Sequence, residues 1–318
     1  MEIFEVLLDA MKILILGAGA TGGYFGGRLA ASGADVTFLV RPKRAAHLAA
    51  DGLVIESPFG NLKTPVRAVT SPTLSGRHDV VILSCKAYGL DQSIEAVRPA
   101  VGPATVVLPI LNGLRHLETL DAAFGPDRVL GGSCHLSVAL AENGTVQHLN
   151  QLHLLTYGPR TPSQKATCEA LYPILAGAGF DVKLSANVVQ SMWDKWVLLA
   201  SLAALTCLFR ASIGEISSAI GGRDLMLSAI DECRSVAKAE GYEPSLDHLA
   251  LIRTLLTDSA SPVVASMLRD MQRGGAIEGD HIAGDMLARG KAAGLEMPML
   301  ATAYANMQCY QNRLTASG

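Results

Sequence analysis

The first half of the chain alternates short, continuous apolar runs with segments whose apolar residues recur every three or four positions. The first pattern predicts buried strands, and the second predicts amphipathic helices. The strands are expected at Lys12–Leu16, Val36–Val40, Val80–Leu83 and Val106–Leu108. The helices are expected at Ala20–Ala31, Arg44–Ala50, Leu90–Val97 and Leu117–Phe124. Apolar strands separated by helices indicate a parallel sheet that is covered on both faces.

Between Val129 and Tyr157 the pattern changes to short β-like runs on either side of Asn143-Gly144. Asn-Gly is a favoured two-residue hairpin turn, so we expect antiparallel strands that add to the sheet. A helix at Lys165–Leu175 and a strand at Phe180–Leu184 then complete this half of the chain.

After about residue 186 the pattern is helical. Helices are expected at Asn187–Phe209, Leu225–Glu240, Leu246–Thr257, Pro262–Gln272, Ile282–Ala293 and Leu300–Leu314. The first is apolar on nearly every side beyond Lys195, which is typical of a helix buried at a domain centre. The expected fold class is therefore α/β, an N-terminal Rossmann-type doubly wound sheet with an all-helical C-terminal domain. We expect these domains at 11–186 and 187–318, with 1–10 as an extension.

Composition and charge narrow the class of protein. The 318 residues suffice for two domains, and a net charge of −3 leaves no basic surplus for binding nucleic acid. The most apolar uncharged stretch, Trp196–Phe209, has 14 residues, whereas a membrane span needs about 20. The acidic N-terminus is unlike a secretory signal, and the six cysteines show no metal-ligand spacing. We therefore expect a cytoplasmic protein with no metal site.

A glycine-rich loop follows the first predicted strand and opens the first predicted helix. Its residues are Gly17, Ala18, Gly19, Ala20, Thr21 and Gly22. Gly17 permits a tight turn, Gly19 lets the backbone approach a pyrophosphate, and Gly22 lets helix and strand pack closely. The unpaired N–H groups at the positive end of the helix then face the diphosphate. The loop predicts dinucleotide binding, and a glycine-rich turn without a ligand is the alternative.

The end of the second predicted strand indicates which dinucleotide is bound. An acidic residue there would hold the ribose 2′-hydroxyl of NAD, but Asp35 comes before this strand and not at its end. The strand runs instead into Arg41, Lys43 and Arg44, three cations where a 2′-phosphate would lie. Arg41 directly follows the strand and is the first candidate for this phosphate, with Arg44 second. The pattern favours NADP(H), and a solvated basic turn is the alternative.

Several spaced motifs lie beyond the glycine loop. They are Asp79–Lys86 with Ala87, Leu108–Gly113, Val129–Gly132, Trp193-Asp194-Lys195, Ser266-Met267 with Asp270, and Arg273–Glu278. In order and spacing they resemble those of the ketopantoate reductases (2-dehydropantoate 2-reductases). The resemblance implies NADPH-dependent reduction of a 2-oxo acid to a 2-hydroxy acid, ketopantoate to pantoate in pantothenate biosynthesis. It also implies a Rossmann domain and a helical domain, with the active site in the cleft between them.

The resemblance implies roles for five residues. Hydride transfer to a ketone leaves an alkoxide, so a positioned group must supply a proton. Lys195 matches the family's catalytic lysine, and the apolar helix behind it would disfavour its charged form, although such a lysine can also snorkel to solvent. Glu278 matches a glutamate that hydrogen-bonds the substrate or the lysine, and Ser266 a serine that binds the substrate carboxylate. Lys86 and Asn112 match positions that contact both nicotinamide and substrate.

The sequence departs from the family's pattern at three positions of the expected pocket. Leu199 and Ala203 replace asparagines four and eight residues after the lysine, and Leu111 replaces a glutamine before Asn112. An apolar pocket cannot select a hydroxylated substrate as strongly as one that hydrogen-bonds its hydroxyl group. The prediction is therefore a 2-oxo acid reductase with Lys195 as proton donor. Its substrate is ketopantoate or a 2-oxo acid with a more apolar tail.

Two further classes of function remain open. One is a non-catalytic NADP(H)-sensing protein, against which the retained Lys195 and Glu278 argue, because a sensor needs no proton donor. The other is a hydroxy-acid or imine reductase with the same two-domain plan. In the enzymatic readings the partner is a small molecule, and the apolar helical half could support a homodimer.

Overall fold

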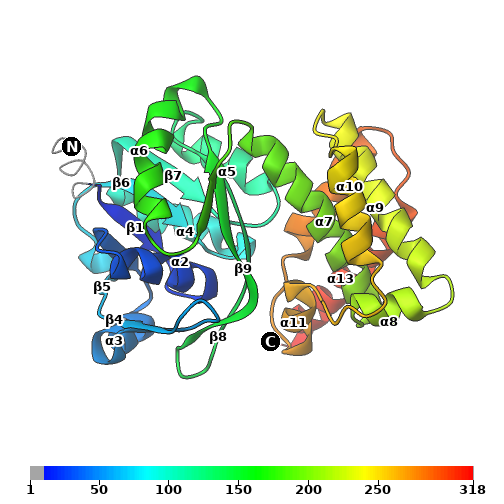
Figure 1. The fold of residues 1–318 in the computed structure, drawn as a ribbon, viewed down its shortest axis with the longest axis horizontal. Coiled ribbons are helices and arrows are strands. Elements are labelled where there is room, and N and C mark those ends of the chain that lie inside the picture. The colour runs from blue at the N-terminus through cyan, green and yellow to red at the C-terminus, as the bar shows by residue number, and fades with distance from the viewer. Residues whose placement is uncertain (1–10, 318) are drawn as a thin grey trace. The chain divides into compact units, whose positions relative to one another are not determined.

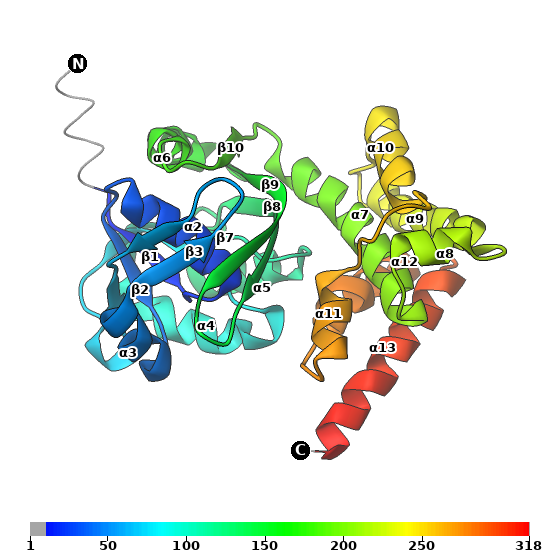
Figure 2. The ribbon, with the colours of Figure 1, turned by 60° about the horizontal axis from the view of Figure 1, so that its bottom comes forward.

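The computed structural model describes residues 11–317, and its internal contacts divide the chain into two compact units. The first unit holds 11–111 and 116–188, and the second holds 112–115 and 189–317 (Figures 1 and 2). The sequence prediction placed 112–115 in the first domain, whereas its contacts put it with the helices of the second unit. The expected extension 1–10 lies outside the described residues.

A parallel sheet of five strands lies at the centre of the first unit, in the order β5-β2-β1-β6-β7. Its strands are β1 (Ile13–Leu16), β2 (Val36–Leu39), β5 (Arg67–Val69), β6 (His78–Leu83) and β7 (Val101–Pro109). The sequence predicts four of these strands and misses β5, because its three residues are not buried and form no apolar run.

Four helices accompany this sheet. They are α2 (Ala20–Ala31), α3 (Pro42–Asp51), α4 (Leu90–Val97) and α5 (Arg115–Phe124). The bounds of α2 and α4 are those that the sequence predicts. Helix α3 begins two residues earlier than expected, at Pro42, since the fixed φ of proline suits the first helical turn. Short 3₁₀ turns lie at Ser71–Thr73, Ala87–Gly89, Arg98–Ala100 and Pro162–Gln164.

The strands around Asn143-Gly144 form part of a second sheet and do not add to the first, which corrects the sequence prediction. This sheet consists of β3 (Leu53–Glu56), β4 (Leu62–Thr64), β8 (Gly131–Leu140), β9 (Val146–Gly158) and β10 (Asp181–Leu184). β8 and β9 make the expected antiparallel hairpin, and β9 then pairs in parallel with β3 and β10. Because β3 lies far back in the sequence, the local pattern could not show this pairing.

Helix α2 packs between the two sheets, since it contacts β1 and β2 of the first and β3, β8 and β9 of the second. Its side chains Tyr24, Phe25 and Leu29 are at most 1% exposed as a result. Helix α6 (Lys165–Ala176) contacts β9 and β10. This packing holds the N-terminus of α2 at the carboxyl end of β1.

The second unit is helical in its described part. It contains α7 (Val188–Phe209), α8 (Ile213–Ser218), α9 (Gly222–Ala239), α10 (Leu246–Leu256), α11 (Ser266–Gln272), a π-helical turn (Asp280–Gly284), α12 (Asp285–Ala292) and α13 (Pro298–Ser317). The sequence predicts all of these helices except α8, whose six residues are too few for a periodic pattern. It also does not predict the π-helical turn.

Helix α11 begins at Ser266 and not at Pro262, as the sequence analysis expected. The chain before it is held outside the helix because the Gly214 N–H donates to the Ser261 carbonyl oxygen. Ala265 takes the N-cap position. Ser266 is therefore the first helical residue.

Helix α7 has the buried character that its apolar pattern predicts. Trp193, Trp196 and Val197 are at most 2% exposed. Among residues 11–317 it is the one helix long and apolar enough to cross a membrane, and 61% of its most apolar window is buried inside the protein. The core helix of a globular protein passes the same test, and the burial of its side chains fits a core helix.

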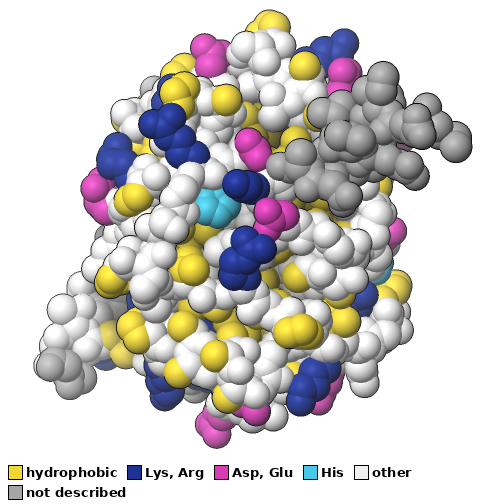
Figure 3. Space-filling view, turned by 90° about the vertical axis from the view of Figure 1, so that its left-hand side faces the viewer, with side chains coloured by type: hydrophobic (Ala, Val, Ile, Leu, Met, Phe, Trp, Pro, Cys, Tyr) yellow, Lys and Arg dark blue, Asp and Glu magenta, His cyan; other side chains and the backbone are white. Residues whose placement is uncertain are grey.

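The surface carries charges of both signs. On the face drawn in Figure 3, Lys and Arg side chains are interspersed with Asp and Glu. This mixture on the drawn face agrees with the small net charge of −3.

Candidate functional site

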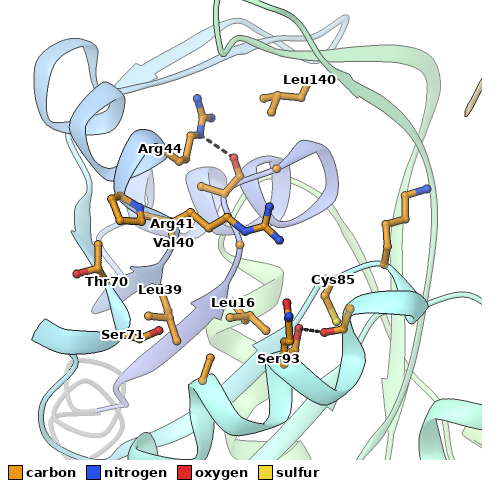
Figure 4. Close-up of a pocket in the computed structure, with 18 of the residues that line it drawn as sticks. Leu16, Leu39, Val40, Arg41, Arg44, Thr70, Ser71, Cys85, Ser93 and Leu140 are labelled. Carbon is orange, nitrogen blue, oxygen red and sulfur yellow. Dashed lines mark hydrogen bonds between the residues drawn. The ribbon is translucent and has the colours of Figure 1, made fainter. Parts of the chain in front are cut away.

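A cavity of about 710 Å³ opens in the first unit at the carboxyl ends of β1, β2 and β6 (Figure 4). Residues directly after these strands line it, namely Gly17, Ala18 and Gly19, then Val40, Arg41 and Pro42, then Cys85 and Lys86. Ligands of open α/β sheets bind at this edge, and the volume lies within the usual range of roughly 300–1,000 Å³ for small-molecule and cofactor sites.

The glycine loop has the geometry of a diphosphate cradle. Gly17 has a φ of +91°, which favours glycine. A Cβ on Gly22 would overlap the Gly17 carbonyl oxygen and the Ser84 hydroxyl, so only glycine lets α2 approach β1 and β6 this closely. A Cβ on Gly19 would meet no protein atom within 4 Å and would instead occupy open space beside the cavity.

The start of α2 offers free positive potential to this cradle. Ala20 and Thr21 begin the helix after Gly19, no side chain caps it, and its first turn holds no acidic residue. Its first N–H groups and the positive end of the helix dipole are thus suited to an anion. The chain's own residues fit a dinucleotide diphosphate at this position.

The cations of the basic turn after β2 have different surroundings. Arg44 donates from Nε to the Ala18 carbonyl oxygen at 2.9 Å and from Nη1 to the Gly144 carbonyl oxygen at 3.0 Å. Burial lowers the pKa of Arg44. Arg41 is exposed, and its side chain extends over the cavity (Figure 4). Lys43 does not line this cavity. Arg41 is therefore placed to meet a phosphate, while Arg44 ties the glycine loop to the β8–β9 hairpin.

The two residues expected to contact both nicotinamide and substrate belong to different units. Lys86 lines the large cavity, directly before the 3₁₀ turn Ala87–Gly89. Asn112 does not line that cavity and belongs to the second unit. There its Oδ1 accepts a hydrogen bond from Lys195 Nζ at 2.9 Å.

A second, much smaller cavity lies within the second unit beside this hydrogen bond. At about 10 Å³ it has room for roughly one water molecule. It is lined by Asn112, Leu199, Ala203, Ala265, Ser266, Met267, Glu278 and Ile282. Three polar residues expected from the family resemblance thus meet here, together with Leu199 and Ala203, two of the three apolar replacements.

The helix period explains this grouping. Lys195, Leu199 and Ala203 follow one another at intervals of four along α7, so all three lie on one face. Ser266 reaches the cavity from the first residue of α11, and Glu278 from just before the π-helical turn. The apolar side chains around it give the site a low local polarity.

The π-helical turn Asp280–Gly284 contributes residues that the sequence analysis did not select. Trp196 Nε1 donates to the Ile282 carbonyl oxygen at 3.2 Å. His281 is 9% exposed and hydrogen-bonds the main chain of Asn112. Burial lowers the pKa of His281, while Glu278 and the bond to Asn112 oppose this effect. The sequence carries no signal for such a turn, since one extra residue in a helix leaves its composition unchanged.

Metal ions in proteins are held by sets of side-chain ligands such as His, Cys, Asp and Glu. Among residues 11–317, no group of three or more His, Cys, Asp and Glu side chains is arranged to hold a metal ion. The charged side chains described so far are Lys195 and Glu278 in the second unit and Arg41, Arg44 and Lys86 in the first.

Known proteins match most of the chain. The family model Ketopantoate reductase PanE/ApbA matches residues 13–161, and its C-terminal counterpart matches residues 187–311. The uncharacterized oxidoreductase YkpB of Bacillus subtilis is 39% identical over 303 residues, covering 95% of this chain and 99% of its own. The 2-dehydropantoate 2-reductase of Pyrococcus horikoshii is 27% identical, covering 91% of this chain and 94% of its own.

Solved structures agree with this match. A PanE/ApbA family ketopantoate reductase from Ralstonia eutropha is 28% identical, with a TM-score of 0.86 over 96% of this chain and 100% of its own. D-mandelate dehydrogenase in a ternary structure with NADH and anilino(oxo)acetate has the same fold, at 20% identity and a TM-score of 0.87 over 96% and 100%. With both halves of the chain matched in order, this protein is an oxidoreductase that belongs to the ketopantoate reductase PanE/ApbA family.

Proposed function

We propose that the protein is an NADPH-dependent reductase that converts a 2-oxo acid to a 2-hydroxy acid, with Lys195 as the proton donor. Family membership supports the reduction of a 2-oxo acid. The observation that carries the proposal is the Lys195 Nζ–Asn112 Oδ1 hydrogen bond, beside a cavity that also holds Ser266 and Glu278. This arrangement orients an ammonium group by a neutral acceptor.

The first unit would hold the cofactor. The residues Gly17–Gly22 would bind the diphosphate, Arg41 the 2′-phosphate, and Lys86 the region towards the nicotinamide. When bound, the nicotinamide supplies a hydride from its C4 atom. Arg41 favours NADPH, although NADH is the cofactor in the ternary structure of the structurally similar D-mandelate dehydrogenase. The coenzyme preference therefore needs a direct comparison.

The second unit would manage charge and protons during the reduction. The carbonyl carbon gains the hydride, and the oxygen that thereby becomes negative takes a proton from Lys195 Nζ. Asn112 Oδ1 holds the ammonium group in place by the 2.9 Å bond. The Ser266 hydroxyl would donate to the substrate carboxylate, and Glu278 would accept from the substrate or from the lysine. The net result is a 2-hydroxy acid and NADP⁺.

A second candidate concerns the substrate's tail. Ketopantoate is the substrate that the family membership suggests first. Leu199 and Ala203, however, line the same cavity as Asn112, Ser266 and Glu278, and neither can hydrogen-bond a hydroxyl group. This favours a 2-oxo acid with a more apolar tail. Anilino(oxo)acetate, held by D-mandelate dehydrogenase, is an oxo acid with an aromatic tail.

The deciding experiment is a panel of 2-oxo acids assayed with NADPH and with NADH. The panel contains ketopantoate and branched-chain and aromatic 2-oxo acids, extended to imines and 3-oxo acids. Lys195→Ala is expected to lower the rate by about 10²-fold or more. The matched control is Lys291→Ala, an exposed lysine of the same unit, which should keep wild-type turnover.

The outcomes of this panel distinguish the proposed reductase from its alternatives. Turnover of at least one 2-oxo acid that depends on Lys195 supports the proposal. Tight NADPH binding without turnover of any compound would favour the NADP(H)-sensing alternative, and wild-type turnover in Lys195→Ala would remove the proton donor. A cytoplasmic location stays a prediction. So does a homodimer, for which a Staphylococcus aureus ketopantoate reductase described as dimeric is a precedent at 21% identity.

A further inference from the structure

His281 lies at a junction of three segments of the second unit. It sits in the π-helical turn Asp280–Gly284, is 9% exposed, and hydrogen-bonds the main chain of Asn112. Because this bond raises the pKa of His281, the imidazole is the donor and the Asn112 carbonyl oxygen accepts. The bond therefore fixes the backbone of the residue whose side chain holds Lys195.

The fit around this bond is close. Gly113, with a φ of +75°, turns the chain directly after Asn112. A Cβ at Gly113 would lie 3.1 Å from His281 Cδ2 and 3.2 Å from Nε2, so the absence of a side chain lets the imidazole reach the main chain. Three charged groups act on the imidazole. Glu278 and Asp285 flank the π-helical turn in the sequence, and Arg115 belongs to the segment 112–115.

A second hydrogen bond attaches the same turn to α7. Trp196, which follows Lys195 in α7, donates from Nε1 to the carbonyl oxygen of Ile282, which follows His281. The π-helical turn is thus attached both to α7 and to the segment that carries Asn112. Asn112 therefore connects the imidazole with the ammonium group. Its main chain bonds His281, and its Oδ1 accepts from Lys195 Nζ.

We propose that His281 is a positioning residue, which holds Asn112 so that its amide orients the Lys195 ammonium group towards the substrate oxygen. The inference rests on the proposed function of Lys195. His281 does not line the small cavity that holds Ser266 and Glu278, and in this proposal it acts on Lys195 through Asn112. Small displacements of a proton donor are costly, since a shift of about 1 Å in a catalytic group can lower a rate by roughly 10²-fold.

The test uses three variants of the full-length protein. His281→Phe keeps a ring but removes the donor, whereas His281→Gln keeps an N–H that can reach the Asn112 carbonyl oxygen. Tyr304→Phe is the matched control, because it removes a 2.8 Å bond from the Tyr304 hydroxyl to Asp280 in the same turn without touching Asn112. We expect kcat to fall roughly 10- to 100-fold in His281→Phe. Most of this loss should be recovered in His281→Gln, and Tyr304→Phe should keep the wild-type kcat.

Two further readouts separate positioning from general damage. The Kd for NADPH should stay at its wild-type value in all three variants, because the proposed cofactor residues belong to the first unit. The side-chain amide signal of Asn112, measured by NMR without substrate, should move in His281→Phe and return in His281→Gln. This signal tests the junction even if the wild-type protein reduces no 2-oxo acid, an outcome that would refute the proposed function instead.

Three results would overturn the inference. The first is wild-type kcat together with an unmoved Asn112 signal in His281→Phe. The second is an equal loss of kcat in His281→Gln and His281→Phe, since the donor would then be irrelevant. The third is an equal loss in Tyr304→Phe, which would reduce the role of His281 to the stability of the turn. If His281→Phe does not fold, His281→Ala, which also lacks the donor but adds no bulk, takes its place in each comparison.

Discussion

Two glycines of the glycine loop, Gly19 and Gly22, are expected to respond in opposite ways to replacement by alanine. In Gly22→Ala the new methyl group would overlap the Gly17 carbonyl oxygen and the Ser84 hydroxyl, so the interior must shift. In Gly19→Ala the methyl group meets no protein atom within 4 Å and enters the space proposed for the diphosphate. The first change should therefore damage the fold, and the second should damage cofactor binding.

The size of each effect follows from the contacts. Overpacking of this kind costs about 1–3 kcal/mol. Moving Ser84 also weakens its 2.8 Å hydrogen bond to the Leu16 carbonyl oxygen, for about 1 kcal/mol more. Gly22→Ala should thus lower the free energy of unfolding by roughly 2–4 kcal/mol and the Tm by about 5–15 °C. Gly19→Ala changes only the N-cap of α2 and should cost at most about 1 kcal/mol.

NADPH binding should show the reverse order. Among folded variants, Gly19→Ala should bind NADPH more weakly than Gly22→Ala. Losing one or two charge-assisted N–H contacts to the diphosphate, each about 1.5–3 kcal/mol, should weaken NADPH binding by Gly19→Ala at least roughly 10-fold. Thermal unfolding without ligand and fluorescence titration with NADPH measure the two quantities separately. Wild-type NADPH affinity in Gly19→Ala would refute the diphosphate cradle, and an unchanged Tm in Gly22→Ala would refute the packing argument.

Three further predictions concern other parts of the molecule. Arg41→Ala should lower the preference for NADPH over NADH roughly 10- to 100-fold in kcat/KM, because one charge-assisted contact to the 2′-phosphate is lost; an unchanged preference would exclude Arg41 from that role. The double variant Leu199→Asn, Ala203→Asn should raise kcat/KM for ketopantoate relative to 2-oxo acids with apolar tails, and a ratio that stays constant would show that this face of α7 does not select the substrate. Burial lowers the pKa of His153 below its usual 6.5, so on acidification the unfolded chain takes up the proton before the folded chain does. The contribution of His153 to the free energy of unfolding is therefore complete above about pH 6.5 and is lost as pH falls below that value. Tm measured at pH 7.5 and 5.5 should therefore drop less in His153→Gln than in the wild type, and equal drops would contradict this.

The local pattern was informative wherever an element's burial follows from its own residues. Helices α2 and α4 have the predicted bounds, and β1, β2 and β6 lie within a few residues of theirs. The edge strand β5 and the short helix α8 escaped because each is too short to show a period. The second sheet escaped for a different reason. Its strands β3 and β9 pair across some ninety positions of sequence, as in Ile55 with Val146, and the sequence analysis predicted no strand at Leu53–Glu56.

The candidate site divides in the same way. Lys195, Leu199 and Ala203 were selected through the family resemblance, and their spacing of four puts all three on one face of α7. Ser266, selected through the family resemblance, is the first residue of α11, which starts about one turn later than expected, and it lines the small cavity. Arg44 illustrates a second limit. Its charge suits a phosphate, yet two of its nitrogens already bond backbone carbonyl groups of Ala18 and Gly144.

By itself, the amino-acid sequence determined the class of fold, the strand–glycine–helix loop at the head of the chain and the residue types available for reduction, because these are properties of neighbouring residues. Only the tertiary structure decided which of those residues meet. Asn112 contacts Lys195 across 83 positions, and His281 of the π-helical turn lies against Gly113 directly after it. Such partners are chosen by the packing of distant segments, since a hydrogen bond forms only where folding brings donor and acceptor within about 3 Å.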